Sequence, residues 1–336
     1  MNALFSKPDA TALPHVVILG AGASRAALPN GDKNGKSIPL MDDLPDVLGD
    51  TWTKLVKGAG VPAGSFEAQF SWLRRCGGYE VALAEVEQLI AEFFRTLELP
   101  DHPTIYDHLV LGLRKQDIIA TFNWDPFLMQ ALRRNRDTAT MPDIRFLHGC
   151  VSYATCNEHD VLGIPTEECP FCAESLIQGK LIYPDDAKDY ASDTMIHRDW
   201  MVVTERLKQA IHFTIFGYSG PATDFNAKQL LLTEWKKNPF LMINHVEIID
   251  IADSDELRRR WSEYIPHQHE IVISRFWESS IAKFPRRTSE WKIAASMYGI
   301  PTEAIGPYRT DDLPDLQAWY SKLAREEIRP SVNLGE

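Results

Sequence analysis

Long hydrophobic runs are absent from this chain, and so is any excess of positive charge. No apolar stretch approaches the roughly 20 residues that a membrane-spanning helix needs. Met1 to Pro14 lacks the basic start and apolar stretch of a secretion signal. The net charge is −12, whereas a general nucleic-acid binder needs a basic face for phosphates. We therefore expect a cytoplasmic protein that contacts neither membrane nor nucleic acid directly.

Cysteine is also scarce, with 5 residues in 336. In a reducing compartment such residues are thiols or metal ligands, not disulfides. Cys76 stands apart from the others, and we expect it in the core. The other four lie within residues 150–185, where helix and strand signals are weak. That concentration is typical of a small metal-binding module.

The spacing within this module favours a structural zinc site. Cys169 and Cys172 are separated by two residues, which is the spacing of half a zinc knuckle. Cys156 supplies a third ligand, and either His159 or Cys150 supplies the fourth. Four protein ligands leave no position for a substrate, so we expect a structural metal. Free thiols in a loop are the alternative.

What the chain does contain is a series of short apolar runs separated by segments of helical periodicity. Continuous apolar runs indicate strands buried on both faces, as in parallel sheets. Strands are predicted at Val16–Leu19, Ile118–Phe122, Ile144–Leu147, Phe213–Phe216, Val246–Asp250 and Glu270–Ser274. Helices are predicted at Tyr79–Leu99, Thr104–Lys115, Asp125–Asn135, Asp199–Ala210, Asp224–Lys237, Ser254–Tyr264, Ser289–Tyr298 and Leu316–Glu327. This alternation predicts an α/β fold.

The order of these segments also predicts how the chain is divided. The sheet domain would be assembled from residues 1–28, 111–149 and 186–285. Residues 29–110 would be an insertion that begins with a Pro-, Gly- and Asp-rich loop, which we interpret as a flap over 29–50, and continues as helices. Residues 150–185 would form the zinc module, and 286–336 a C-terminal helical segment.

Small or polar residues follow directly after four of the predicted strands. Asn123 and Asp125 follow one of these strands, and Pro126 then opens a helix. The others are followed by Gly20–Ser24, by His148 and Gly149, and by Gly217–Gly220. Ligands of open parallel sheets bind beyond the carboxyl ends of the strands. The sequence therefore predicts one site at which these four strand ends converge.

Each of these features alone has a simpler interpretation. Asn123 and Asp125 could be helix caps, and His148 could be an ordinary core histidine. Ser219 could belong to a plain turn, and Asp250 could cap the turn that follows its strand. The first glycine turn also lacks the third glycine of the dinucleotide fingerprint. The common position at strand ends favours a shared site over these separate explanations.

In their order and spacing, five short motifs resemble those of the sirtuin family. They are Gly20–Ser24, Thr121–Asp125, Leu147–Gly149, the cysteine module and Gly217–Ser219. The resemblance extends from residue 16 to about residue 252, and it is nearest to the bacterial sirtuin-like NADase effectors of antiphage defence. It implies a Rossmann-like parallel sheet with helices on both faces, which binds NAD. It also implies a small lobe made of the helical insertion and a zinc-knuckle-like module.

The resemblance assigns roles to the residues at the strand ends. Asn123 and Asp125 would hold the nicotinamide-side ribose and order a water, and His148 would be the general base. The remaining residues would contact NAD through its pyrophosphate or the adenosine ribose. These are Gly20, Ala21, Gly22, Ser24, Thr121, Gly217, Ser219 and Asp250. The metal ligands would be Cys156, His159, Cys169 and Cys172.

Two departures from the family pattern bear on the reaction. Sirtuin deacylases carry a Gly-Ile-Pro-Asp-Phe-Arg-like segment after the phosphate turn, where this chain has Arg25–Asp32. Their peptide-binding segment after the zinc module is replaced by Tyr183–Asp186. We therefore expect an NAD glycohydrolase that releases nicotinamide and ADP-ribose as a regulated defence effector. The alternative is an NAD-dependent protein lysine deacylase.

A third hypothesis is a non-enzymatic module that senses an NAD-derived nucleotide. Retention of both Asn123 and His148 argues against it, because binding alone needs neither a base nor a positioned water. Besides NAD, the expected partners are an ATPase or another defence protein. We also expect a homo-oligomer.

Overall fold

The structure is a computed structural model, and it describes residues 12–156, 158–159, 161–184, 190, 193–221, 224–241, 244–265, 270–299 and 303–327. The chain ends at 1–11 and 328–336 lie outside the described residues, as do Asp185 and Asp186 of the segment that replaces the peptide-binding stretch. In the part of the chain that is described, no helix is both long and apolar enough to cross a bilayer.

Within the described residues, six parallel strands form the central sheet, in the order β3-β2-β1-β7-β8-β9. They are β1 (His15–Leu19), β2 (Ile118–Thr121), β3 (Asp143–Phe146), β7 (His212–Phe216), β8 (His245–Ile249) and β9 (Glu270–Ile273). Counted along the chain this is the 3-2-1-4-5-6 order of dinucleotide-binding sheets, in which strand order reverses beside the first strand. The predicted Rossmann-like parallel sheet is confirmed.

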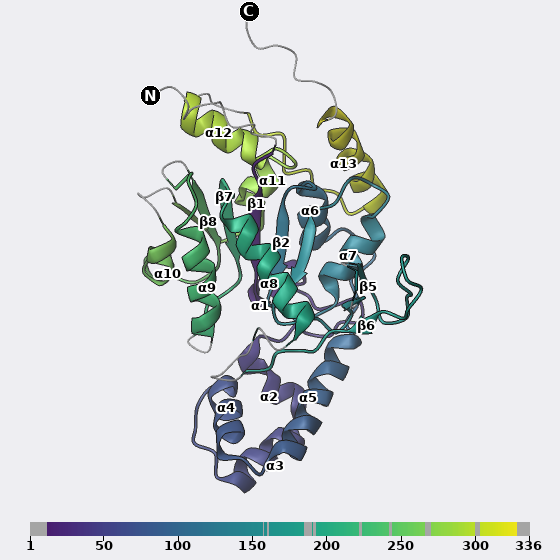
Figure 1. The fold of residues 1–336 in the computed structure, drawn as a ribbon, viewed down its shortest axis with the longest axis vertical. Coiled ribbons are helices and arrows are strands. Elements are labelled where there is room, and N and C mark those ends of the chain that lie inside the picture. The colour runs from purple at the N-terminus through teal and green to yellow at the C-terminus, as the bar shows by residue number, and fades with distance from the viewer. Residues whose placement is uncertain are drawn as a thin grey trace, which may run out of the picture.

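Helices cover both faces of the sheet because its central strands place apolar side chains on both faces. Val17 and Leu19 of β1 pack into one core cluster, while Val16 and Ile18 pack into the other. The first face is covered by α1 (Ala21–Ala27), α6 (Ile105–Gly112), α7 (Phe127–Asn135) and α11 (Ser280–Lys283). The second is covered by α8 (Thr194–Leu207), α9 (Phe225–Trp235) and α10 (Ser254–Trp261). Of these, α8 is seen in front of the sheet in Figure 1.

The helical insertion forms a lobe at one end of the molecule (Figure 1). It contains a 3-10 turn at Met41–Asp43 and the helices α2 (Leu44–Leu48), α3 (Asp50–Ala59), α4 (Phe66–Cys76) and α5 (Glu80–Arg95). The prediction of a continuous loop over 29–50 was wrong in its second half. Leu44, Leu48 and Trp52 recur every four residues and are buried in the main core, so packing determines helix there. Cys76 ends α4 and is exposed, contrary to expectation.

Helix α8 begins earlier than predicted. The carboxylate of Asp193 accepts hydrogen bonds from the backbone N–H groups of Met195 and Ile196, so Asp193 is the N-cap. Asp199, which had suggested the helix start, is buried in the second turn. Its carboxylate accepts hydrogen bonds from the N–H of Phe146 (2.7 Å) and from Arg145 (3.2 Å). It therefore ties α8 to β3.

The rest of the described chain forms the cysteine module and the C-terminal helices. The module contains a small sheet in the order β5-β4-β6, formed by β4 (Ala154–Thr155), β5 (Leu162–Gly163) and β6 (Ile177–Gln178). The last helices are α12 (Thr288–Tyr298) and α13 (Leu313–Glu327). In Figure 1 they lie at the end of the molecule opposite the α2–α5 lobe.

Candidate functional site

A cavity of about 800 Å³ lies beyond the carboxyl ends of the central strands. Ten of the predicted catalytic and binding residues line it: Gly20, Ala21, Gly22, Ser24, Asn123, Asp125, His148, Gly217, Ser219 and Asp250. Thr121 does not. It is buried behind the wall, where its hydroxyl accepts a 3.0 Å hydrogen bond from the backbone N–H of Asn123. Asp250 also caps its own turn, by accepting from the N–H of Ala252.

The two glycine turns at the strand ends pack directly on each other. The N–H of Gly22 donates to the carbonyl of Gly217 at 2.9 Å. A Cβ at Gly22 would lie 2.8 Å from the Cα of Gly217. Gly217 has a φ of +59°, and a Cβ there would lie 2.1 Å from the amide nitrogen of Ala23. Both glycines are therefore required by the close approach of the two turns.

The amide of Asn123 is fixed by two acceptors on the first turn. Its Nδ2 donates to the carbonyl of Gly20 and to Oγ of Ser24, both at 2.9 Å. Because a carbonyl can only accept, this contact identifies the nitrogen of the amide. No described residue donates a hydrogen bond to Oδ1 of Asn123. The side chain therefore offers the cavity an acceptor that can orient a water or a sugar hydroxyl.

A buried chain of hydroxyls leads from this amide to Asp125. Ser24 Oγ donates to Asp125 Oδ2 at 2.6 Å, so the hydroxyl of Tyr106, 2.7 Å from the same Oγ, must be a donor to it. Burial raises the pKa of Asp125 to about 6, although hydrogen bonds from Ser24 and the N–H of Phe127 oppose that shift. Sequence reasoning missed Tyr106, which carries no local signal of this role.

His148 lies at the end of β3 in an aromatic setting. The edge-to-face contact with Phe122 has ring centroids 4.7 Å apart. Its Nε2 is 3.3 Å from the hydroxyl of Tyr190 and 3.9 Å from Oδ1 of Asp224. A carboxylate at this distance favours the imidazolium that forms when a histidine takes up a proton. His148 is thus placed to accept a proton in the cavity.

Asp224 is the second residue that the sequence did not identify. It occupies the N-cap of α9, where an aspartate is expected to cap the helix, but its side chain makes no capping bond. Its Oδ2 instead accepts a 2.8 Å hydrogen bond from the hydroxyl of Tyr218, and it lines the cavity. Because an aspartate at this position is expected to cap the helix, the sequence did not indicate that Asp224 faces His148.

The first part of the insertion covers the cavity. Residues 39–44, which belong to the segment interpreted as a flap, line it. Arg25 holds this segment through hydrogen bonds of 3.2 and 3.0 Å to the carbonyl of Ile38 and through an ion pair with Asp43. In the sequence, Arg25 is the first residue of the segment that replaces the Gly-Ile-Pro-Asp-Phe-Arg-like stretch of the deacylases. It connects the first glycine turn to the flap.

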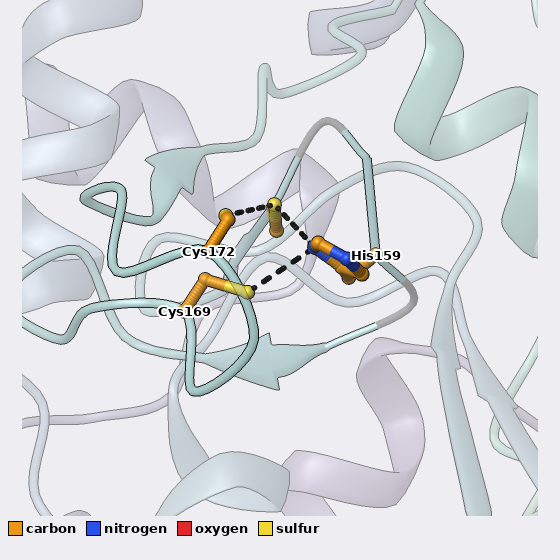
Figure 2. A group of neighbouring side chains, drawn as sticks. His159, Cys169 and Cys172 are labelled. Carbon is orange, nitrogen blue, oxygen red and sulfur yellow. Dashed lines mark hydrogen bonds between the residues drawn. The ribbon is translucent and has the colours of Figure 1, made fainter.

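The cysteine module brings three thiols and one imidazole together (Figure 2). His159 Nδ1 lies 3.5 Å from the sulfurs of Cys156 and Cys169, and the sulfurs of Cys156 and Cys172 are also 3.5 Å apart. Metal bonds of about 2.0–2.3 Å in a tetrahedron place ligand atoms roughly 3.3–3.8 Å apart. The set therefore fits a structural zinc ion.

The fourth ligand position goes to His159 rather than to Cys150. The thiol of Cys150 lies outside the cluster and donates to the backbone carbonyl of Asp125 at 3.1 Å. Burial raises its pKa to about 12, whereas a metal ligand must be a thiolate. Cys150 therefore belongs to the wall behind the cavity.

No protein-family model matches the chain, and no curated protein matches it. Solved structures of Sir2 enzymes are similar to it. One, described under the structural basis of Sir2 mechanism and regulation, has 12% identity and a TM-score of 0.38, with 86% of this chain and 94% of that chain covered. A complex of a Sir2 homologue with NAD has 10% identity and a TM-score of 0.36, with 94% and 91% covered.

Proposed function

We propose that this protein is an NAD glycohydrolase that cleaves the bond between nicotinamide and ribose. The observation that carries the proposal is the pairing of two groups in one cavity. Asn123 presents a fixed acceptor from the end of β2, and His148 presents an imidazole backed by Asp224 from the end of β3. The sirtuin-like motif order supports NAD as the substrate, and cavities of this size accommodate ligands of its class.

In the proposed hydrolysis, each of these residues has a separate role. Oδ1 of Asn123 accepts a hydrogen bond from the attacking water, and His148 takes the proton that this water loses. The water oxygen bonds to the ribose carbon while the carbon–nitrogen bond breaks, and nicotinamide leaves with the bonding electrons. The products are nicotinamide, ADP-ribose and one proton. Asp224 stabilises the imidazolium formed on His148.

The packing of Tyr183 favours water over an acylated peptide as the nucleophile. Tyr183 belongs to the segment that replaces the peptide-binding stretch of the deacylases. Its ring packs on Trp124 with centroids 5.2 Å apart, and its hydroxyl donates to the carbonyl of Glu87 in α5 at 2.8 Å. Tyr183 is therefore held by contacts with the loop after β2 and with the helical insertion. Peptide docking there would have to break them.

We further infer that the enzyme is a regulated effector of antiphage defence. The motif pattern is nearest to that group, and an unregulated NAD hydrolase would deplete the NAD of its own cell. Arg25, which holds the flap over the cavity, provides a point at which opening could be controlled. A partner protein that alters the flap would switch the activity.

The test is incubation of purified protein with NAD, alone and with an acyl-lysine peptide, followed by chromatography of the products. Nicotinamide and ADP-ribose formed without peptide would support the hydrolase. Nicotinamide released only with peptide, together with an acylated ADP-ribose, would establish the deacylase instead. Calorimetric binding of NAD with no turnover in either mixture, also after addition of lysate from phage-infected cells, would favour a sensing module. Asn123→Ala serves as the control that should still bind NAD.

A further inference from the structure

Three buried histidines lie side by side at the amino ends of the central strands, at the sheet edge opposite the cavity. His15, His212 and His245 are the first residues of β1, β7 and β8, and the strand register pairs them in that order. The rings of His15 and His212 stack with centroids 4.0 Å apart and planes inclined by 14°. Each ring is fully or nearly fully buried. None of the three takes part in the proposed reaction.

A buried carboxylate lies on the same face of the sheet. Glu247 follows His245 by two residues, so both side chains point to one face of β8. Its Oε1 accepts from the N–H of Ser280, and its Oε2 accepts from the hydroxyls of Ser280 and Thr214 at 3.1 and 3.2 Å. One ligand atom from each of His212, His245 and Glu247 lies within 4.8 Å of the others.

His212 has one unsatisfied ring nitrogen. His212 is fully buried, its Nε2 lies 3.3 Å from the hydroxyl of Ser280, and its Nδ1 has no hydrogen-bond partner among the described residues. His15 differs, because both of its ring nitrogens have threonine hydroxyls as partners, at 3.0 and 2.8 Å. A buried polar atom without a partner destabilises the folded state. The unsatisfied Nδ1 of His212 therefore points to a ligand at this residue.

We propose that His212, His245 and Glu247 bind a divalent transition metal of the zinc class, at a second site separate from the cysteine module. Two imidazoles and one carboxylate form a ligand set that zinc accepts. Ser280 adds a hydroxyl oxygen within the same cluster. The ring of Trp291 lies against both histidines, with centroids 6.0 and 5.9 Å away, and contributes to covering them.

One buried cation lies near this cluster. Lys292 is buried and close enough to His212 to act on it electrostatically, and its positive charge opposes an ion at the cluster. Lys292→Met should therefore strengthen metal binding, an effect that a purely hydrogen-bonded histidine layer would not show.

The position of this site indicates a structural role. A metal there would tie the amino ends of β7 and β8, far from the carboxyl ends that line the cavity, to the segment that begins α11 at Ser280. This segment leads into the C-terminal helices. The ion would thus lock the last part of the chain onto the sheet, and its removal should lower the melting temperature.

The test is to count metal ions in purified protein saturated with Zn²⁺ and then freed of excess ion, by elemental analysis. The wild type should carry two ions per chain, and Cys169→Ser should carry one. His245→Gln and Glu247→Gln should each carry one, held by the cysteine module. The matched control is His15→Gln, which removes a buried histidine of the same layer but no ligand and should keep two. A wild type with one ion, or an unchanged count in Glu247→Gln, would overturn the proposal.

A second measurement avoids variants that fail to fold. Metal-free wild type can be titrated with Co²⁺ and followed by visible absorption. The cysteine module should produce thiolate charge-transfer absorption that saturates at one equivalent. The second site has no sulfur ligand, so the weaker metal-centred bands should continue to rise until two equivalents are bound. Saturation of all bands at one equivalent would exclude the second site.

Discussion

The hydroxyl of Ser24 donates a 2.6 Å hydrogen bond to the buried carboxylate of Asp125, which joins the first turn of α1 to the loop after β2. The same oxygen accepts from Asn123. The protonation state of Asp125 therefore decides whether Ser24 can direct its proton toward the carboxylate and its lone pairs toward the amide. The order of the whole network depends on one ionisable group.

The first prediction concerns stability and pH. Burial raises the pKa of Asp125 from 3.8 to about 6, so between these values the folded protein holds a proton that the unfolded chain has released. The free energy of unfolding should fall through this window as pH rises, by up to about 3 kcal/mol, and level off above it. Asp125→Asn has no carboxyl group at this position, so its free energy of unfolding lacks this pH dependence.

Urea unfolding of the wild type and Asp125→Asn from about pH 4 to about pH 8 measures the effect. The stability of the wild type relative to the variant should decline across the acidic part of the range and stay constant at neutral pH. A difference that is the same at every pH would contradict the raised pKa of Asp125.

The second prediction concerns Asp224 and rests on the proposed hydrolysis. His148→Ala should reduce kcat for nicotinamide release by about a hundredfold or more, because a positioned base is lost. Asp224→Asn keeps the shape but removes the charge 3.9 Å from Nε2, so roughly a tenfold to hundredfold loss in kcat with little change in KM is expected.

Tyr218→Phe is the matched control for Asp224→Asn. It removes the hydroxyl that donates to Asp224 but leaves the carboxylate beside His148. Its loss of kcat should be smaller than that of Asp224→Asn. Equal losses in the two variants would assign Asp224 a role in packing rather than in positioning His148.

The third prediction concerns the contact between the glycine turns. Gly217→Ala places a Cβ against the backbone of Ala23 in a left-handed conformation, and Gly22→Ala places one against Gly217. Each should destabilise the protein by about 1–3 kcal/mol, and Gly217→Ala by the larger amount. Gly58→Ala is the control, because it lies in α3 with no atom near its Cβ position. It should stabilise the protein by about 0.5–1 kcal/mol, as thermal unfolding would measure.

The fourth prediction concerns the cysteine module. Cys169→Ser should lose the zinc ion of the module and loosen residues 150–184, because the binding free energy of a structural metal is largely folding free energy. Hydrogen exchange should report faster exchange there while the central sheet stays protected. Cys76→Ser removes an exposed thiol outside the cluster and should retain the metal. Unchanged zinc content in Cys169→Ser would exclude the site.

Much of the fold could be predicted from the sequence because its signals are local. An apolar run such as Val16–Leu19 is typical of a strand buried on both faces, and six predicted strands that alternate with helices favour a parallel sheet. Carboxyl ends of parallel strands share one edge, so Asn123, His148 and Gly217 had to meet there. The spacing of Cys169 and Cys172, with two residues between them, is also a local signal, and it predicted that both thiols belong to one metal site.

Other features were decided only by packing between distant parts of the chain. The sequence of residues 41–48 predicts a loop, but Leu44 and Leu48 are buried in the main core and the segment is helical. Asp199 and Asp224 resemble helix caps, but strand order places partners for them on β3 and at its end.

The same limit applies to ligand choice and to the histidine row. His159 rather than Cys150 faces the other thiols because Cys150 is held by the backbone of Asp125. The alignment of His15, His212 and His245 follows from the order β1-β7-β8 and its register. The local sequence determines hydrophobic periodicity and the preference of a residue for a helix cap. The partner of a buried polar group depends on which elements the tertiary structure places beside it.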